Sequence, residues 1–384
     1  MKLFDVYPIL NIELNKGEGV YVFDTKGNMY LDFYGGHAVI SIGHSHPYYI
    51  QSLIEQIHKI SYYSNSVSIS QKNKLSNLLG SISGYEDYSL FLCNSGTESN
   101  ENALKIASFH TGKKKMIFFK GAFHGRTSGS ISVTDNYKLV SPFNAQHETI
   151  LIDYRNIDLL EEKLKNQDIC AVITEGIQGL SGIIDPGSYF FYKVRDLCKR
   201  YDVILIIDEV QSGYGRTGSF FSHQLYDSIR PDLITIAKGM GNGFPIGGVL
   251  IHPKFKSYHG MLGSTFGGNY LACTAGISVL EIIKKENLIE NAKKMGKILL
   301  QELRLIPEIK NIRGRGLMIG LEFDFPIQYL KNILIYKEKV FIGTSNNPCI
   351  LRLLPPLNIR ENHIELFMNK LKKSLFYLYK KNGK

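Results

Sequence analysis

The chain lacks several features that would assign a protein to a class at once. Its 384 residues contain no apolar run of about 18 residues, which argues against a membrane-spanning helix. The opening MKLFDVYPIL carries Asp5 and Pro8 where a signal peptide would be apolar, so we expect a cytoplasmic protein. No internal repeat or low-complexity linker is visible. What remains is a globular protein long enough for two domains.

Cysteine is scarce, and its spacing does not suggest metal or disulfide chemistry. The five cysteines include no CxxC pair, which disfavours both a disulfide framework and a thiolate zinc site. His44 and His46 in GHSHP have no further ligands at a suitable spacing. We therefore expect a turn before a helix at that point, and no metal.

The net charge of +10 would suit a nucleic-acid-binding protein. The lysines are scattered through the chain, however, and those in NAKKMGK and in the C-terminal KLKKSLFYLYKKNGK have the spacing of solvated faces on amphipathic helices. We therefore expect neither a nucleic-acid partner nor a membrane partner.

Continuous apolar runs alternate with helical patterns in the middle of the chain. KMIFFK, AVITEG, VILIIDEV and DLITIAK have the composition of buried strands, and GSYFFYKVRDLCKRY has apolar residues at helical spacing. This alternation predicts an α/β fold with a mostly parallel central sheet covered on both faces. We predict a large domain over 46–277 and a smaller α/β domain over 278–384, with residues 1–45 packed against the smaller domain through a hairpin at DTKGN.

In open parallel sheets, ligands bind outside the carboxyl ends of the strands, so the residues that follow each predicted strand carry the information. After YSLFLC, Ser95 and Glu98 form the S-x-x-E capping box that starts a helix. The free amides of Ser95, Gly96 and Thr97 at this helix start would also bind a phosphate. Ser95 as a helix cap and nothing more is the alternative.

Two further strand ends carry candidate ligand groups. GAFHGRTSGS presents Phe123, which could stack on a planar ring, and Arg126, which could bind a carboxylate. Asp208 ends the apolar run VILII, where a carboxylate needs a cationic partner or a strong donor such as a protonated ring nitrogen. An internal ion pair for Asp208 and a surface ion pair for Arg126 are the alternatives.

Gly213 to Gly218 spell GxGxxG, the dinucleotide-binding fingerprint, but their context argues against that function. Five residues separate the strand from Gly213, two of them acidic, and no clear helix follows Gly218. We therefore do not expect a nicotinamide cofactor.

Lys238 follows the strand-like LITIA and precedes the glycine-rich GMGNGFPIGG. Apolar surroundings favour a neutral amine, which is nucleophilic toward an aldehyde. A single cofactor would use a lysine, a carboxylate for a ring nitrogen, a helix start for a phosphate and an aromatic for a flat ring. That cofactor is pyridoxal 5′-phosphate (PLP).

These motifs resemble one family. FLCNSGTESNENALKIA, GAFHGRTSGS, ILIIDEVQSGYGRTG, PDLITIAKGMGNGFPIGG, GSTFGGN and LRLLPPL are similar to the class III (ω-)aminotransferases over nearly the whole chain. Within the family, the compact chain and FHGRT are most similar to the acetylornithine aminotransferases of arginine biosynthesis. The resemblance implies the PLP-dependent transferase fold type I and a homodimer with shared active sites.

The resemblance also assigns roles to residues at the cofactor. Lys238 would bind the cofactor covalently and later move a proton, and Asp208 would keep its ring nitrogen protonated. The other cofactor-binding positions are Ser95, Gly96 and Thr97 at the phosphate, joined by Thr265 from the partner subunit, with Phe123 and Val210 on the two faces of the ring and Gln211 at its phenolic oxygen.

Three residues would bind the substrates. Arg126 would bind the distal carboxylate end, Arg352 would bind the α-carboxylate of glutamate or 2-oxoglutarate, and Glu175 belongs to the same group by its place in the motif.

The chain departs from the family pattern at two places. Relatives read E-P-x-Q-G-E-x-G where this chain has EGIQGLSG, so Leu180 replaces a glutamate that pairs with the arginine at the Arg352 position when an ω-amine is bound. His37 in GGHAV stands where an aliphatic residue is more usual, near the expected substrate entrance. Both leave the identity of the amine donor open.

The expected activity is transfer of the δ-amino group of N-acetylornithine, or another N-acylornithine, to 2-oxoglutarate. Another ω-amine is the main alternative: ornithine, succinylornithine, lysine or 4-aminobutyrate. A PLP-dependent aminomutase would need no external keto acid, and a dicarboxylate anchor at Arg352 argues against it. A non-catalytic PLP-binding protein conflicts with the intact Lys238 and Asp208.

Overall fold

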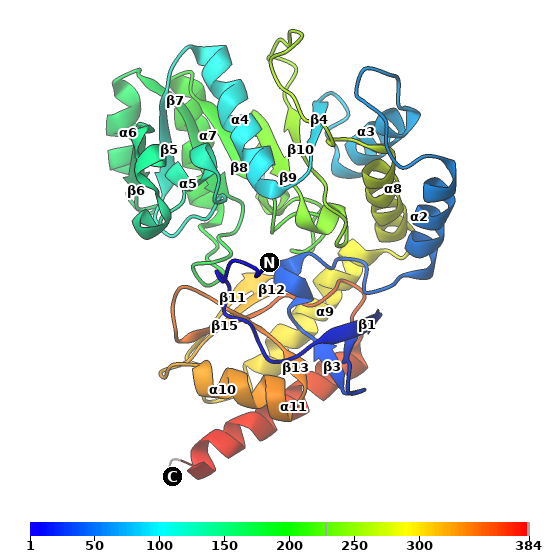
Figure 1. The fold of residues 1–384 in the computed structure, drawn as a ribbon. Coiled ribbons are helices and arrows are strands. Elements are labelled where there is room, and N and C mark those ends of the chain that lie inside the picture. Colours follow the sequence, from blue (N-terminus) through cyan, green and yellow to red (C-terminus); the bar gives the residue numbers. More distant parts are fainter. Residues whose placement is uncertain (227–228, 382–384) are drawn as a thin grey trace.

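The computed structural model describes residues 1–226 and 229–381. Its largest unit is a seven-stranded sheet in the upper part of Figure 1, with strand order β4-β10-β9-β8-β7-β5-β6. All strands run parallel except β10, which is antiparallel to both of its neighbours. The α/β fold with a mostly parallel central sheet is therefore confirmed. The strands are β4 Ser89–Cys93, β5 Lys115–Phe119, β6 Thr149–Ile152, β7 Ile169–Glu175, β8 Ile204–Asp208, β9 Leu233–Ile236 and β10 Gly247–Ile251.

Helices cover both faces of this sheet, as the continuous burial of β7, β8 and β9 requires. On one face, α4 packs its alanines and leucine against Met116, Phe118 and Ile173 of the sheet. On the other face, α7 packs Phe190 and Val194 against residues of β7 and β8. The helices of this part are α2 Pro47–Lys59, α3 Ser70–Ser83, α4 Gly96–Thr111, α5 Ser128–Ser132, α6 Ile157–Lys165, α7 Gly187–Arg200 and α8 Tyr270–Lys285.

Two four-stranded sheets lie below the central sheet in Figure 1, with orders β1-β2-β3-β13 and β11-β12-β15-β14. Their strands are β1 Leu14–Glu18, β2 Tyr21–Asp24, β3 Met29–Asp32, β11 Asn311–Arg315, β12 Met318–Glu322, β13 Val340–Phe341, β14 Gly343–Thr344 and β15 Ile350–Leu353. The helices here are α9 Leu288–Leu303, α10 Gln328–Asn332 and α11 Glu361–Lys381. The hairpin predicted at DTKGN joins β2 to β3. The domain boundaries stay a prediction.

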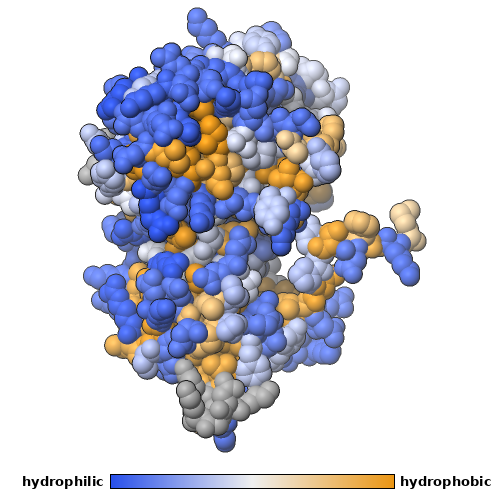
Figure 2. Space-filling view, turned by 90° about the vertical axis from the view of Figure 1, so that its left-hand side faces the viewer, coloured by the Kyte–Doolittle hydropathy of each residue, from blue (hydrophilic) through white to orange (hydrophobic). Residues whose placement is uncertain are grey.

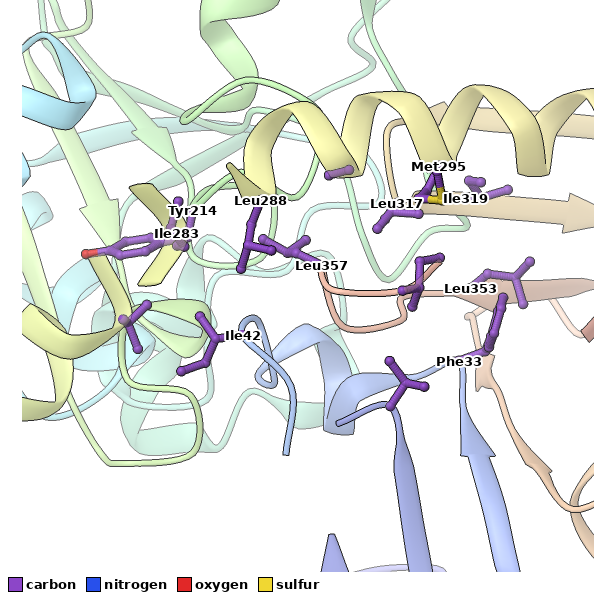
Figure 3. Packing of buried hydrophobic residues seen from close by; sticks show 14 of the residues in the cluster. Phe33, Ile42, Tyr214, Ile283, Leu288, Met295, Leu317, Ile319, Leu353 and Leu357 are labelled. Carbon is purple, nitrogen blue, oxygen red and sulfur yellow. The ribbon is translucent and has the colours of Figure 1, made fainter. Parts of the chain in front are cut away.

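A shared core joins the first 45 residues to the last hundred. β3 pairs in parallel with β13, and the ring of Phe33 stacks on Phe367 of α11 with centroids 4.2 Å apart. Figure 3 shows Phe33 beside Leu353, with residues of α9 and β12 completing the cluster. Packing of this kind fixes β15, which carries Arg352, relative to the N-terminal segment.

The sequence ISVLEIIKKENLIENAKKMGKILLQEL, whose apolar residues have helical spacing throughout, forms parts of two helices, α8 and α9. Asn287 between them has φ +53°, a left-handed conformation that asparagine adopts more readily than most residues. Periodicity did not reveal this break, because the apolar spacing continues across it. No helix in the described ranges has both the length and the apolar character needed to cross a bilayer.

Candidate active site

A cavity of about 600 Å³ opens at the carboxyl ends of β5, β7, β8 and β9. This is the place where ligands bind in open parallel sheets. Nearly all of the predicted site residues line it: Ser95, Gly96, Thr97, Phe123, Arg126, Glu175, Asp208, Val210, Gln211, Lys238 and Arg352.

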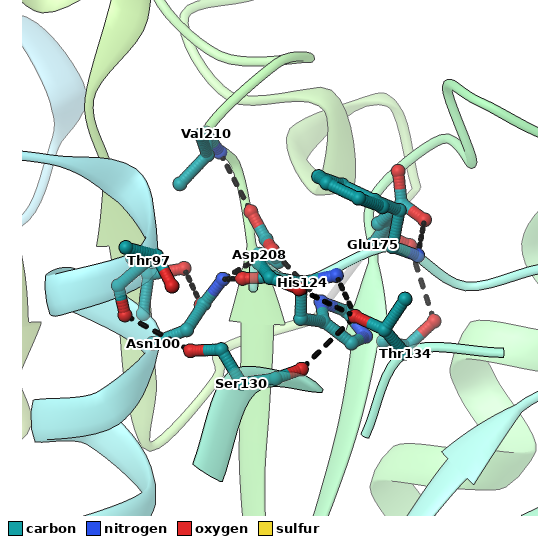
Figure 4. A network of polar contacts seen from close by, with 12 residues as sticks. Thr97, Asn100, His124, Ser130, Thr134, Glu175, Asp208 and Val210 are labelled. Atoms are coloured by element: carbon teal, nitrogen blue, oxygen red, sulfur yellow. Dashed lines mark hydrogen bonds and ion pairs between the residues drawn. The ribbon is translucent and has the colours of Figure 1, made fainter. Parts of the chain in front are cut away.

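Asp208 is the last residue of β8, and only 4% of it is exposed. Its Oδ2 accepts hydrogen bonds from Asn100 Nδ2 and from His124 Nδ1, both at 2.8 Å, and its Oδ1 accepts from the Val210 amide at 2.9 Å (Figure 4). These donors stabilise a buried carboxylate and fix its orientation. The sequence prediction missed Asn100. Its spacing of four from Gly96 could have revealed it, because such residues share one face of a helix.

Lys238 follows β9 with one residue between them, and it is partly buried at the cavity wall. Burial lowers the pKa of its amine, and the Arg352 guanidinium acts in the same direction, whereas Asp208 and Glu175 oppose the shift. A larger neutral fraction makes this amine a better nucleophile. Its φ of +47° is unusual for a residue with a side chain and is a form of backbone strain that functional sites often hold.

The predicted helix start after β4 is confirmed. Ser95 is the N-cap of α4, and its Oγ accepts from the Glu98 amide at 3.3 Å. The amides of Gly96 and Thr97 lie in the first turn, where no intrahelical acceptor exists. The Thr97 hydroxyl lies 2.7 Å from that of Thr127. This end of the helix fits a phosphate group.

Glu175 at the end of β7 organises the loop that carries Phe123. Its Oε1 accepts from the Phe123 amide at 3.0 Å, and its Oε2 accepts from the Gly179 amide at 2.8 Å. Burial raises the pKa of this carboxyl to about 7, with Asp208 adding to the shift. Both oxygens are therefore engaged by the backbone, and the predicted contact of Glu175 with substrate stays a prediction.

Two arginines bring positive charge to the cavity. Arg352 on β15 is 2% exposed, and it donates from Nε to Thr344 O at 2.6 Å and from Nη1 to Gln211 Oε1 at 3.4 Å. No carboxylate of the described chain lies within ion-pair distance of it, and Leu180 lines the same cavity. Arg126 is exposed at the wall.

Thr265 is the one predicted site residue that this chain does not bring to the cavity. It is exposed, although the neighbouring Ser264 Oγ accepts from Asn94 Nδ2 at the cavity wall, at 3.1 Å. Its predicted place was in the active site of a partner subunit. Within residues 1–226 and 229–381, no cluster of three or more potential metal ligands occurs.

The side chains of the cavity fit the predicted cofactor. The wall contains an amine with a lowered pKa at Lys238, a fully hydrogen-bonded carboxylate at Asp208, a helix N-terminus for an anion and the flat side chain of Phe123. Gly96 is needed at this helix start, because a Cβ there would lie 2.5 Å from Val210 Cγ1. Each part of PLP thus meets a group of matching chemistry.

Comparison with known proteins identifies an aminotransferase family over nearly the whole chain. The family Aminotransferase class-III matches residues 5–375. The acetylornithine aminotransferase of Archaeoglobus fulgidus is 37% identical over 94% of this chain and 95% of its own length. A transaminase of Sulfolobus acidocaldarius, named for [LysW]-aminoadipate semialdehyde and glutamate semialdehyde, is 36% identical over 99% of both chains.

Among solved structures, the ornithine aminotransferase of Toxoplasma gondii, which was described with partial occupancy of PLP at its active site, superposes with a TM-score of 0.91. It is 28% identical, and the match covers 99% of this chain and 94% of that one. Because sequence and fold agree from end to end, and the cavity keeps a group for each part of the cofactor, this chain belongs to the class III aminotransferases and uses pyridoxal 5′-phosphate.

Proposed function

We propose that the enzyme transfers the δ-amino group of an N-acylornithine, with N-acetylornithine as the first choice, to 2-oxoglutarate. The products are the corresponding semialdehyde and glutamate, and the reaction belongs to arginine biosynthesis. Curated relatives at 37% identity carry the name acetylornithine aminotransferase and match at least 94% of this chain. The observation that carries the proposal is a cavity with two guanidinium groups, one buried at Arg352 and one exposed at Arg126.

The two arginines suit the substrates of this reaction. Arg352 lies in the same cavity as Lys238, and its charge is close enough to lower the pKa of that amine. It would therefore bind the carboxylate beside the reacting carbon of glutamate or 2-oxoglutarate. Arg126 would bind the carboxylate at the far end of the N-acylornithine while its δ-amine reaches Lys238.

The other residues would divide the chemistry among them. When bound, the cofactor supplies an electron sink for the reacting carbon. Lys238 Nζ would hold it covalently and, once released as an amine, would carry the proton between substrate carbon and cofactor carbon. The Asp208 carboxylate would keep the ring nitrogen protonated. Phe123 and Val210 would hold the ring from its two faces, with the α4 N-terminus on the phosphate and Gln211 at the phenolic oxygen.

A different ω-amine is the second candidate. The Sulfolobus relative, at 36% identity, is named for [LysW]-aminoadipate semialdehyde and glutamate semialdehyde, and the structural relatives include ornithine aminotransferases. Leu180 also gives this cavity no acidic partner for Arg352. Every ω-amine, N-acylornithine included, lacks a carboxylate beside the reacting amine and would leave that charge unpaired, so Leu180 does not favour one of these donors over another.

A half-reaction tests the donor directly. The PLP enzyme is mixed with N-acetylornithine, N-succinylornithine, ornithine, lysine or 4-aminobutyrate, without any keto acid. Loss of the visible absorbance of the lysine-bound cofactor reports amine transfer. We expect fast loss with an acylated ornithine, and the converted enzyme should then be restored by 2-oxoglutarate. Silence with both acylated donors and a response to another amine would contradict the proposal.

We also propose that the enzyme is a homodimer in which Thr265 completes the phosphate site of the partner. One face of α2 exposes Ile50, Ile54 and Ile57, and Thr265 lies on an exposed loop beside the exposed Phe266. The N-terminal residues Leu3 and Phe4 are more than 90% exposed, and Figure 2 shows an extended arm that carries apolar side chains.

Analytical ultracentrifugation should give twice the 43.4 kDa chain mass, and Thr265→Ala should weaken PLP affinity. A monomer with full activity would contradict this assembly.

A further inference from the structure

The segment 35–38, labelled α1, is a single left-handed turn at the edge of the active-site cavity. Gly35 and Gly36 both have φ +55°, followed by His37 at +68° and Ala38 at +65°. Left-handed backbone costs about 1–2 kcal/mol for each residue that carries a Cβ. The chain accepts this strain at two consecutive positions, and such strain often accompanies functional sites.

Neighbouring groups fix the turn firmly. Asp32 Oδ1 accepts from the amides of Tyr34 and Gly35, at 2.9 and 2.8 Å. The Gly35 carbonyl accepts from the amides of Val39 and Ile40. A Cβ on Gly35 would lie 2.8 Å from the Leu354 carbonyl, so glycine is required there. The side chain of His37 is therefore presented from a rigid support.

The turn presents His37 to the part of the cavity that contains Arg352. His37 lines the cavity together with Lys238, Gln211 and Arg352. Gln211 joins the two: its Nε2 donates to the His37 carbonyl at 3.2 Å, and its Oε1 accepts from Arg352 Nη1 at 3.4 Å. His37 and Arg352 are thus held in one polar unit.

Tyr34 holds the imidazole ring. Its hydroxyl contacts His37 Nδ1 and lies 3.3 Å from Nε2, and the two ring centroids are 4.7 Å apart. The ring of Tyr34 is itself pressed against Gly343, where a Cβ would lie 2.5 Å from Tyr34 Cε2. No other polar group of the described chain is within hydrogen-bond reach of either imidazole nitrogen.

The surroundings of His37 determine the protonation state of its imidazole ring. His37 belongs to the exposed residues of the chain, yet desolvation of its ring at the cavity wall lowers its pKa to about 4, and the nearby Arg352 and Lys238 act in the same direction. At neutral pH the ring is uncharged and has one N–H. The Tyr34 hydroxyl contacts His37 Nδ1, and with its hydrogen directed at Nδ1 this nitrogen is the acceptor of the neutral ring. The remaining N–H is then on Nε2.

We propose that His37 is a specificity-determining residue whose Nε2–H binds, together with Arg352, the carboxylate beside the reacting carbon of the keto acid. The inference rests on the proposed function, in which Arg352 binds that carboxylate. A neutral imidazole adds a hydrogen-bond donor without adding a third positive charge beside Arg352 and Lys238. An aliphatic side chain on this turn would supply no donor.

The test separates the keto acid from the amine donor. Glutarate, a five-carbon dicarboxylate without a keto group, cannot react, so its dissociation constant on the PLP enzyme can be measured by calorimetry. His37→Ala should raise that constant and the KM for 2-oxoglutarate by roughly 10-fold, the usual effect of losing a hydrogen bond to a charged group. The rate of the half-reaction with N-acetylornithine should change much less.

Two further variants and a control make the test specific. His37→Gln should restore most glutarate binding, because its side-chain amide can donate in place of Nε2–H. Tyr34→Phe should weaken glutarate binding by releasing the ring. His110→Ala, an exposed histidine in the last turn of α4, should match the wild type. Retained cofactor absorbance in each variant shows that the site is folded.

The outcomes distinguish this inference from the proposed function. Unchanged glutarate binding in His37→Ala, no glutarate binding by the wild type, or a loss confined to the acylated donor would overturn the role of His37. If the wild type transfers nothing from acylated ornithines while His37→Ala still weakens glutarate binding, the proposed donor fails and His37 keeps its role.

Discussion

At the scale of single residues, the site depends on ionisable groups whose surroundings have shifted their pKa values. The Lys238 amine is shifted toward its neutral form, mainly by burial. The carboxyl of Glu175 is shifted toward its protonated form by the same cause. Among the described residues, neither group has an oppositely charged partner at hydrogen-bond distance, so both should respond to small changes in the cavity.

Lys238→Ala should abolish transamination, because no other described lysine lines the cavity to hold the cofactor or move the proton. The Asp208 carboxylate and the α4 N-terminus remain, so we expect PLP to bind non-covalently. The measurement is turnover with N-acetylornithine and 2-oxoglutarate, together with an absorbance spectrum of the bound cofactor. Lys120→Ala, outside the cavity, is the matched control. Turnover at the wild-type rate in Lys238→Ala would mean that the cofactor lies elsewhere.

The stability of the protein should depend on pH through Glu175. Its pKa is about 7 in the folded protein against an ordinary 4.5. The folded protein therefore holds this proton more tightly, and the stability gained from it is full below pH 4.5 and falls as pH rises to 7. The loss amounts to about 3 kcal/mol at most.

Glu175→Gln removes that proton equilibrium. The difference between its urea midpoint and that of the wild type should therefore move in favour of the variant between pH 5 and pH 8. Glu365→Gln, at an exposed position of α11, is the control and should follow the wild type. A constant difference at both pH values would show that Glu175 is ionised throughout.

At the scale of elements, one buried hydrogen-bonded pair, Glu209 and His223, closes the loop that follows β8. Glu209 is 1% exposed and accepts hydrogen bonds from the amides of Ser222 and His223, at 3.0 and 2.9 Å, and from the Ser212 hydroxyl at 2.7 Å. His223 Nδ1 lies 2.7 Å from Glu209, and its Nε2 lies 2.6 Å from the Tyr85 hydroxyl. The loop between them begins with Val210 and Gln211, so this pair positions two residues of the cavity.

His223→Ala should therefore destabilise the enzyme by roughly 1–3 kcal/mol, because Glu209 and the Tyr85 hydroxyl each lose a buried hydrogen-bond partner. Burial is the larger influence on the Glu209 carboxyl, yet its donors hold its pKa below the ordinary value. Its stabilising effect is consequently present near neutral pH and lost in acid. Thermal unfolding at pH 7 measures the change, with the exposed His110→Ala as control. Equal melting temperatures would show that the pair adds no stability.

The sequence predicted the elements better than it predicted the contacts between them. The strand that ends at Asp208 and the strand that precedes Lys238 were predicted from continuous apolar runs, since a strand buried on both faces has no polar positions. The left-handed turn at His37 was not predicted, because its hydrogen bonds and close contacts come from Asp32 and Leu354, and the second is distant in sequence. The spacing of Asn100 from Gly96 places it on the cavity face of α4, but its contact and that of His124 with Asp208 could not be predicted, since three separate segments meet there.

At the scale of the whole molecule, Arg216 joins three parts of the chain. It is 2% exposed and donates to the carbonyls of Leu317, Pro355 and Ile40. Its own carbonyl accepts from the Leu317 amide at 2.9 Å. Burial lowers the pKa of this guanidinium to about 9. A charged group that donates to these three carbonyls fixes the loop after β8 against the residue that precedes β12, the segment after β15 and the chain that follows the His37 turn.

Arg216→Met should therefore reach the substrate site, although Arg216 does not line the cavity. Methionine fills much of the volume but cannot donate to the three carbonyls, and unsatisfied buried carbonyls cost about 1–3 kcal/mol each. We expect a lower melting temperature, faster amide exchange in β15 and a higher KM for 2-oxoglutarate, because β15 carries Arg352. Arg304→Met, at the exposed end of α9, should change none of these.

If Arg216→Met lowers stability while exchange in β15 and the KM stay at wild-type values, Arg216 stabilises the fold without positioning Arg352. If all three change together, the carboxylate site is held in place by contacts that cross the whole molecule.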